Sequence, residues 1–234
     1  MSKKKTAQTT EECDSLEIQR LVPTQKRSRE RYELILTTAT EIIVEKGSES
    51  LKMSDIVEKA GVPHGSLYQY FADKNAIIGT LAERCNLEGR ACVETHLSDV
   101  STQKELHAAL MTMTDEYYEV FINEPLMRDI WHATQSNRLL QKLDAEDMEI
   151  LSAMLAKVIQ KLKPESDPHK VSIASLLIMN LISATVRHAM TLEPKEGELM
   201  IAAFKRIFPK NLSALLGPVN THSKSALEPQ NRPG

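Results

Sequence analysis

Apolar residues recur three or four positions apart over most of the stretch from residue 25 to residue 209. This spacing places side chains along one face of an α-helix, and the strict alternation typical of a half-buried strand is not found. Composition agrees, because aromatic residues make up only 4% of the 234 residues, while the good helix formers Leu, Ala, Glu, Lys and Met are frequent. We therefore predict an all-α protein of about nine helices.

Capping signals divide this stretch into separate helices. Gly47 is suited to ending a helix, and Pro125 and Pro168 to opening one. Thr102 and Glu105 have the spacing of a capping box. The predicted helices cover residues 28–46, 53–60, 64–70, 73–96, 138–162 and 196–208, with others beginning near Thr102, Pro125 and Pro168.

Charge and cysteine content narrow the classes of protein. The formal net charge is -3, so affinity for nucleic acid has to come from a local surface. Three cysteines without a CxxC pair do not indicate disulfides or a zinc site, and we expect no metal and no cofactor. The N-terminus has no apolar run, and polar residues such as Asn180 and Arg187 interrupt the apolar stretch 171–190. We expect neither a secretory signal nor a membrane span, and a cytoplasmic location.

Residues 53–74, MSDIVEKAGVPHGSLYQYFADK, have the layout of a helix-turn-helix. Two short amphipathic segments flank a turn at Gly61, a residue that takes positive φ without strain. Val62 and Leu67 are placed to fill the space between the two helices. The second helix would then point its first turn, residues 63–66, at a major groove, which indicates DNA binding.

The segment AGVPHGSLYQYFADK resembles the signature of the tetracycline-repressor (TetR) family, in which a Gly-Val turn precedes Gly-x-x-Tyr-x-Tyr-Phe and a Lys three residues on. The resemblance covers residues 27–84, and the rest of the chain is similar to the family only in the number and order of its helices. It implies a transcription repressor that binds a palindromic operator as a homodimer. A small hydrophobic effector would release the repressor from this double-stranded DNA.

The same resemblance assigns roles to individual residues. Tyr68, Tyr70 and Lys74 take positions that contact DNA phosphates, and the chemistry agrees, because hydroxyl and ammonium groups donate to phosphate oxygens. His and Ser side chains of the recognition helix can read base edges. Core packing is the alternative for both tyrosines. The full predicted DNA-binding set is Arg27, Arg29, Ser54, His64, Gly65, Ser66, Tyr68, Gln69, Tyr70 and Lys74.

Two positions depart from the family pattern. Lys52 stands where the family has a Thr that caps the second helix, so Ser50 or Ser54 is expected to cap it. Pro63 and His64 stand where Ser-Lys is frequent, which removes one non-specific lysine contact.

Eight of the ten methionines lie beyond residue 100, close to most of the aromatic residues of that half. Methionine adapts to varied apolar ligands, and pockets between helices are apolar with a few polar anchors. Arg128 or Arg187 could hold an acidic group of an effector, with an ordinary salt bridge as the alternative. The predicted ligand-binding residues, for which an ordinary core is the alternative, are Met113, Tyr117, Phe121, Met127, Arg128, Trp131, Met154 and Met179.

These patterns predict a division of the chain into four parts. They are a disordered N-terminal arm (1–24), a three-helix helix-turn-helix domain (25–72), a helical ligand-binding and dimerisation domain (73–209) and a flexible tail (210–234). By the resemblance, residues 168–190 and 195–208 stand where the family forms its dimer. The alternative is an all-helical ligand-binding protein or enzyme that keeps the helix-turn-helix only as structure. The sequence has no nucleophile–base pair or phosphate loop to support catalysis, so we expect no enzyme.

Overall fold

The computed structural model describes residues 23–211 and residue 216. Most of the predicted arm and tail, residues 1–22, 212–215 and 217–234, therefore lies outside the described residues. Within the described part the chain forms nine helices, in agreement with the predicted all-α class. They are α1 (Lys26–Lys46), α2 (Met53–Ala60), α3 (His64–Tyr70), α4 (Lys74–Ser98), α5 (Gln103–Asn123), α6 (Pro125–Ser136), α7 (Arg138–Leu162), α8 (Pro168–Ala189) and α9 (Pro194–Ile207).

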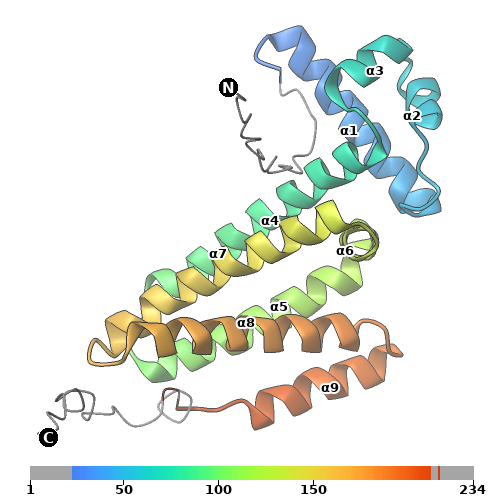
Figure 1. Ribbon diagram of the computed structural model, residues 1–234. Helices are drawn as coiled ribbons and strands as arrows, with labels where there is room; N and C mark the ends of the chain where they lie inside the picture. Colours follow the sequence, from blue (N-terminus) through green and yellow to red (C-terminus); the bar gives the residue numbers. More distant parts are fainter. Residues whose placement is uncertain (1–22, 212–215, 217–234) are drawn as a thin grey trace, which may run out of the picture.

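The helices form a small group and a larger group joined by α4. Helices α1, α2 and α3 gather at one end of the molecule, and α4 leaves them to run alongside α7 (Figure 1). Helix α8 packs between α7 and α9, with α5 against its inner side. Helix α6 contacts α1, α4 and α7, so it links the small group to the larger one.

Local capping chemistry explains where most helices begin. The Asp73 side chain accepts a hydrogen bond from the Ala76 amide, 2.9 Å away, and so starts α4. Thr102 and Glu105 form the predicted capping box of α5, and Asp167 caps α8. The predicted cap of α2 is wrong, because Lys52 occupies the N-cap without a side-chain hydrogen bond. Ser54 instead donates to the Asp55 carboxylate at 3.1 Å.

Three apolar cores lie among the described helices. The first packs α1, α2, α3 and the start of α4 around fully buried residues such as Ile35, Ile56 and Phe71. The second fills the space among α4, α5, α7 and α8 around residues such as Leu110 and Ile178. The third lies where α5, α6, α8 and α9 meet.

Helix α8 combines a buried face with an exposed apolar one. Its length and apolar composition would allow it to cross a membrane, and 44% of its apolar 18-residue stretch is buried inside the fold. Core helices of soluble proteins have the same composition. Ile173, Leu177 and Leu181, each four residues apart, remain exposed on the outer face.

Candidate functional site

The turn between α2 and α3 has the conformation expected from the sequence. Gly61 takes a left-handed conformation with φ of 64° and ψ of 28°, which side chains with a Cβ adopt at a cost. Val62 and Leu67 are buried where the two helices cross, as predicted. The turn therefore holds α3 at a fixed angle on the surface of the small helical group.

Helix α3 presents a polar face to solvent. His64, Gly65, Tyr68 and Gln69 are exposed, and the rings of His64 and Tyr68 stack with centroids 5.4 Å apart. Tyr68 has 48% of its surface exposed, although it is a large aromatic residue. These side chains offer hydrogen-bond donors and acceptors on one surface, which is what contact with base edges and phosphates needs.

Tyr70 does not share this surface. Only 2% of it is exposed, and its ring packs edge-on against Tyr32 of α1, with centroids 5.9 Å apart. The prediction that Tyr70 contacts phosphate is therefore corrected: this side chain belongs to the core. The two tyrosines lie on opposite sides of α3, because two residues of a helix turn it through about 200°.

Helix α1 brings basic residues to the side of the small group where it contacts α3. Arg31 of α1 donates to the Ser66 hydroxyl at 3.5 Å, which brings the start of α1 beside α3. Arg27 and Arg29, earlier on α1, are exposed, and Arg29 also donates to the Thr24 carbonyl.

Lys74 and Ser54 lie on the neighbouring helices. At the start of α4, Lys74 donates through Nζ to the Glu49 carbonyl at 3.2 Å, which leaves its positive charge near the surface of the small group. Ser54 is exposed in the first turn of α2.

The predicted ligand-binding residues do not line one cavity. Tyr117, Phe121, Met127 and Trp131 pack together near the ends of α5 and α6, while Met113, Met154 and Met179 belong to the second core. Arg128 lies partly exposed on α6. Tyr117 packs against both clusters, so the two clusters adjoin, and a shared ligand site among these residues stays a prediction.

Two surface recesses occur elsewhere, and none of the eight predicted residues lines either. One, of about 640 Å³, opens between α5 and α9 and includes Tyr118 and Lys205. The other, of about 400 Å³, opens between α7 and α8 and includes Asp144, Met148 and Arg187.

Arg187, at the edge of this second recess, is the centre of a polar group. Its guanidinium makes two hydrogen bonds to Asp144, at 3.1 and 2.8 Å, and lies 5.4 Å from the centroid of the Trp131 ring. Burial opposes its charge, but Tyr117 and Asp144 outweigh burial and raise the pKa of Arg187. Among the described residues, Nε of Arg187 and Nε1 of Trp131 are buried donors without a hydrogen-bond partner. Each of them is a donor that an acceptor on a ligand could satisfy.

A second ion pair continues this group towards α4. Arg90 of α4 donates to Asp147 of α7 at 2.5 Å. Burial raises the pKa of Asp147, although Arg90 acts in the opposite direction. Asp144 and Asp147 are three residues apart and so lie on the same face of α7. These acids do not stand out in the sequence, because charged residues on a helix usually mark a solvated face.

Two family models match this chain. One, described as "Bacterial regulatory proteins, tetR family", matches residues 35–81, and the other, "Tetracyclin repressor-like, C-terminal domain", matches residues 104–216. Together they cover more than half of the sequence. The chain belongs to the TetR family. The match of the first model falls on the helix-turn-helix, and that of the second on α5 to α9, so the family's two parts coincide with the two groups of helices.

Individual relatives agree with this membership. The TetR-family chain is 48% identical over 58 residues to YvdT of Bacillus subtilis, named as an uncharacterized HTH-type transcriptional regulator, a match that covers 25% of this chain and 30% of that protein. It is 30% identical over 87 residues to the fatty acid metabolism regulator protein of Bacillus subtilis, covering 37% of this chain and 45% of the relative. Both matches thus span less than half of the relatives' lengths.

A solved structure extends the likeness of fold to most of the TetR-family chain. A TetR-family transcriptional regulator from Pectobacterium atrosepticum superposes with a TM-score of 0.63 at 18% identity. The superposition covers 83% of this chain and 98% of the other. At this level of identity the comparison establishes the shared helical fold.

Proposed function

We propose that this chain is a dimeric transcription repressor that binds a near-palindromic DNA operator through α3. The observation that carries the proposal is the exposed polar face of α3, held by the Gly61 turn and flanked by basic residues of α1. Tyr68, Arg27, Arg29 and Lys74 would bind phosphates and set the position of the protein on the duplex. His64, Ser66 and Gln69 would face base edges and select the sequence.

The outer face of α8 and α9 supports dimerisation. Leu177 belongs to the exposed apolar residues of α8, and α9 also exposes Leu199 and Ile207, of which Ile207 is 81% exposed. Exposed apolar side chains that gather on neighbouring helices often mark an interaction site. A two-fold dimer through this face would place two α3 helices on one side of a duplex, at half-sites about 34–36 Å or a multiple of this apart.

The polar group around Arg187 supports an effector with an apolar body and a carboxylate or carbonyl acceptor. The unpaired donor of Arg187 or of Trp131 would bind the acceptor once the packed cluster around them opens, and the apolar side chains of that cluster would bind the rest. The name of one relative, the fatty acid metabolism regulator protein, supports a ligand of this class. The role places the protein in the cytoplasm and assigns it no catalytic step.

The ion pairs offer a route from effector to DNA. An effector that draws Arg187 away from Asp144 would disturb the neighbouring Asp147 and its bond to Arg90. Arg90 belongs to α4, which begins directly after the helix-turn-helix. A shift of α4 would change the spacing of the two α3 helices in the dimer, so that both no longer fit their grooves.

Selection from a pool of random duplexes tests the DNA-binding role. The full-length protein should enrich an inverted repeat, because a two-fold dimer reads two identical half-sites. Recovery of no enriched sequence would mean that the helix-turn-helix is only structural and that the chain is an all-helical ligand-binding protein.

Fluorescence of Trp131, the single tryptophan, tests the effector. A medium-chain fatty acid should change the fluorescence and release the enriched duplex, whereas the alcohol of equal chain length should bind more weakly. Arg187→Met should reduce the binding of the acid and leave that of the alcohol. If the acid saturates the fluorescence change but leaves DNA affinity unaltered, it binds the DNA-bound and DNA-free forms of the protein equally well. The effector assignment would then be wrong.

A further inference from the structure

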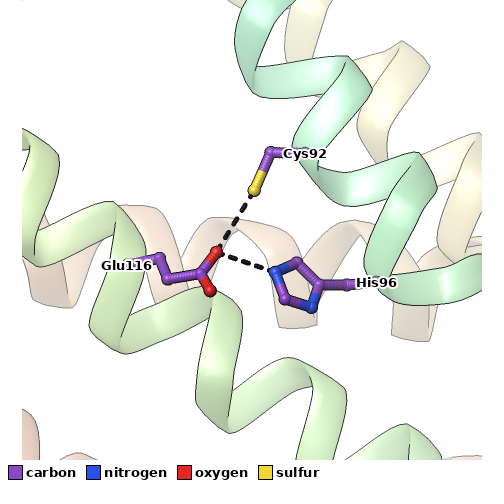
Figure 2. A group of neighbouring side chains, drawn as sticks. All are labelled: Cys92, His96 and Glu116. Carbon is purple, nitrogen blue, oxygen red and sulfur yellow. Dashed lines mark hydrogen bonds and ion pairs between the residues drawn. The ribbon is translucent and has the colours of Figure 1, made fainter.

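Three side chains that bind metals in other proteins converge between α4 and α5. Cys92 and His96 lie one turn apart on α4, and Glu116 points at both of them from α5 (Figure 2). His96 Nε2 lies 2.7 Å and Cys92 Sγ 3.4 Å from the same oxygen, Glu116 Oε2. The three potential ligand atoms all lie within 4.8 Å of one another.

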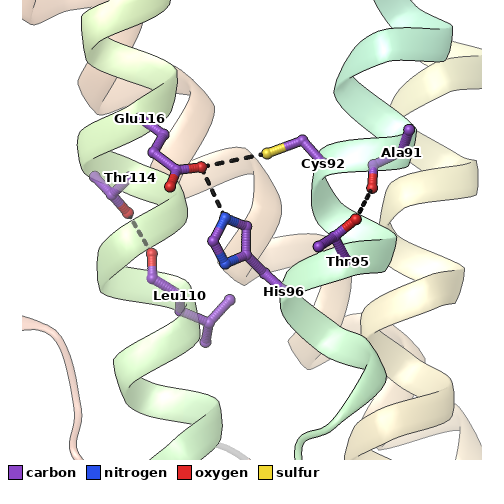
Figure 3. A network of polar contacts seen from close by, with 7 residues as sticks. All are labelled: Ala91, Cys92, Thr95, His96, Leu110, Thr114 and Glu116. Carbon is purple, nitrogen blue, oxygen red and sulfur yellow. Dashed lines mark hydrogen bonds and ion pairs between the residues drawn. The ribbon is translucent and has the colours of Figure 1, made fainter.

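The backbones that carry these residues are fixed by packing. Val93 and Leu97 of α4, next in sequence to Cys92 and His96, are buried in the second core, as are Leu110 and Met113 of α5. Neighbouring hydroxyls are engaged within their own helices: Thr95 donates to the Ala91 carbonyl and Thr114 to the Leu110 carbonyl (Figure 3). The space between the helices is therefore left to the sulfur, nitrogen and carboxylate groups.

The donor set selects a class of metal. Thiolate, imidazole and carboxylate together suit zinc and its neighbours, whereas magnesium and calcium prefer oxygen ligands. In a tetrahedral zinc site, with bonds of about 2.0–2.3 Å, the ligand atoms lie about 3.3–3.5 Å apart. The Sγ–Oε2 separation already has this value. The Nε2–Oε2 separation has to lengthen by about half an ångström, which a small rotation of the partly exposed Glu116 side chain provides.

We propose that Cys92, His96 and Glu116 bind a zinc-class divalent metal ion that ties α4 to α5. The ion replaces the protons of the hydrogen bonds that join these groups. Because Cys92 is exposed, water can take the fourth coordination position of the ion. Because α4 also carries the helix-turn-helix, the bound ion holds this helix in one position. This last consequence, a change in DNA affinity on metal binding, rests on the function proposed above.

Cobalt(II) titration of the full-length protein tests the site itself. The wild type should bind one Co²⁺ per chain and develop a thiolate-to-cobalt absorption band together with the visible bands of tetrahedral coordination. Cys92→Ser should lose the thiolate band. Loss of residues that only support a ligand weakens metal binding by about 10–100-fold, so loss of the ligand itself should weaken zinc binding by about 100-fold or more. His96→Ala and Glu116→Gln should keep the band but weaken binding.

Controls separate the site from the other thiols and from misfolding. Cys85→Ser, on the same helix but outside the group, and Cys13→Ser should both keep the wild-type band. Glu116→Gln preserves the shape of the side chain, so it reports on ligand loss even if another variant fails to fold. Absence of a thiolate band in the wild type, or its persistence in Cys92→Ser, would overturn the site.

Zinc added to the protein bound to its enriched duplex tests the link to DNA. Coupled sites usually change each other's affinity by about fivefold or more, and this change should be absent in Cys92→Ser. An intact thiolate band with unchanged DNA affinity would contradict the link and leave the metal site standing. Failure to bind any duplex, with or without zinc, would contradict the proposed function, and the absorption result would be unaffected.

Discussion

Two tyrosines of α3, Tyr68 and Tyr70, have opposite environments and should therefore respond oppositely to substitution. Tyr68→Phe removes an exposed hydroxyl and should weaken duplex binding by about tenfold, the value of a hydrogen bond to a charged group, with little effect on stability. Tyr70→Ala should lower the free energy of unfolding by about 3–5 kcal/mol, because it empties a packed site. Fluorescence anisotropy with labelled duplex and urea unfolding measure the two effects.

Tyr70→Phe is the matched control and should keep wild-type DNA affinity, since its ring remains in the core. If Tyr70→Phe abolished DNA binding while Tyr68→Phe left it intact, the assignment of surface and core on α3 would be reversed.

At the residue scale, the sequence is informative where the chemistry is local. Gly61, Val62 and Leu67 behave as predicted, because a turn and the contacts across it depend on neighbouring residues. The burial of Tyr70 depends on α1, which lies far away in the sequence. An amphipathic residue such as tyrosine suits either environment, so its type alone could not decide.

Two glycines in helices should respond differently to alanine. A Cβ at Gly197 of α9 would overlap the Tyr118 hydroxyl and lie 2.7 Å from the Ala189 carbonyl oxygen, so Gly197→Ala should destabilise the fold by about 1–3 kcal/mol. At Gly89 of α4 a Cβ meets nothing within 4 Å, and Gly89→Ala should stabilise it by about 0.5–1 kcal/mol. Thermal unfolding compares the two, and equal shifts would contradict the close approach of α9 to α5 and α8.

The contact of α7 with α4 and α8 should make stability depend on pH through Asp147. Burial raises the pKa of Asp147, which faces Arg90 of α4, Arg187 of α8 and Asp144 of its own helix. The folded chain thus holds a proton that the unfolded chain has released. Stability should fall as pH rises from the ordinary value of 3.8 through the higher folded pKa.

Asp147→Asn should remove this fall in stability with rising pH. The free energy of unfolding of the variant should therefore decline less across the same pH window. Urea unfolding at several pH values provides the measurement. Glu146→Gln, at an exposed position on the same helix, should keep the wild-type profile. Identical pH profiles for Asp147→Asn and the wild type would contradict the effect of burial.

At the element scale, helix existence and most caps follow from the sequence, because capping bonds join residues two or three positions apart. Contacts between distant helices do not follow from it. The Cys92–His96 spacing is visible in the sequence, but Glu116 joins it only through the packing of α4 on α5. Arg187 likewise meets Asp144 only because α8 packs on α7.

For the whole molecule, dimerisation through the exposed face of α8 predicts that a charged side chain placed on this face weakens the dimer strongly. Leu177→Glu should raise the dimer dissociation constant by about 30-fold or more, because it places an unpaired charge in an apolar interface. Leu87→Glu alters a leucine on α4 that is more exposed, 60% against 46% for Leu177, and should leave the dimer intact. Analytical ultracentrifugation distinguishes them. A monomeric wild type, or equal effects of both substitutions, would contradict this interface.

The central claim is that two copies of α3 read one inverted repeat. Titration of the full-length protein into the enriched duplex, monitored by anisotropy and ultracentrifugation, tests it most directly. We expect chains to bind in twos, with the affinity greatly reduced for a duplex that keeps only one half-site and for a scrambled duplex. Equal affinity for the intact, half-site and scrambled duplexes would contradict sequence-specific recognition by a dimer.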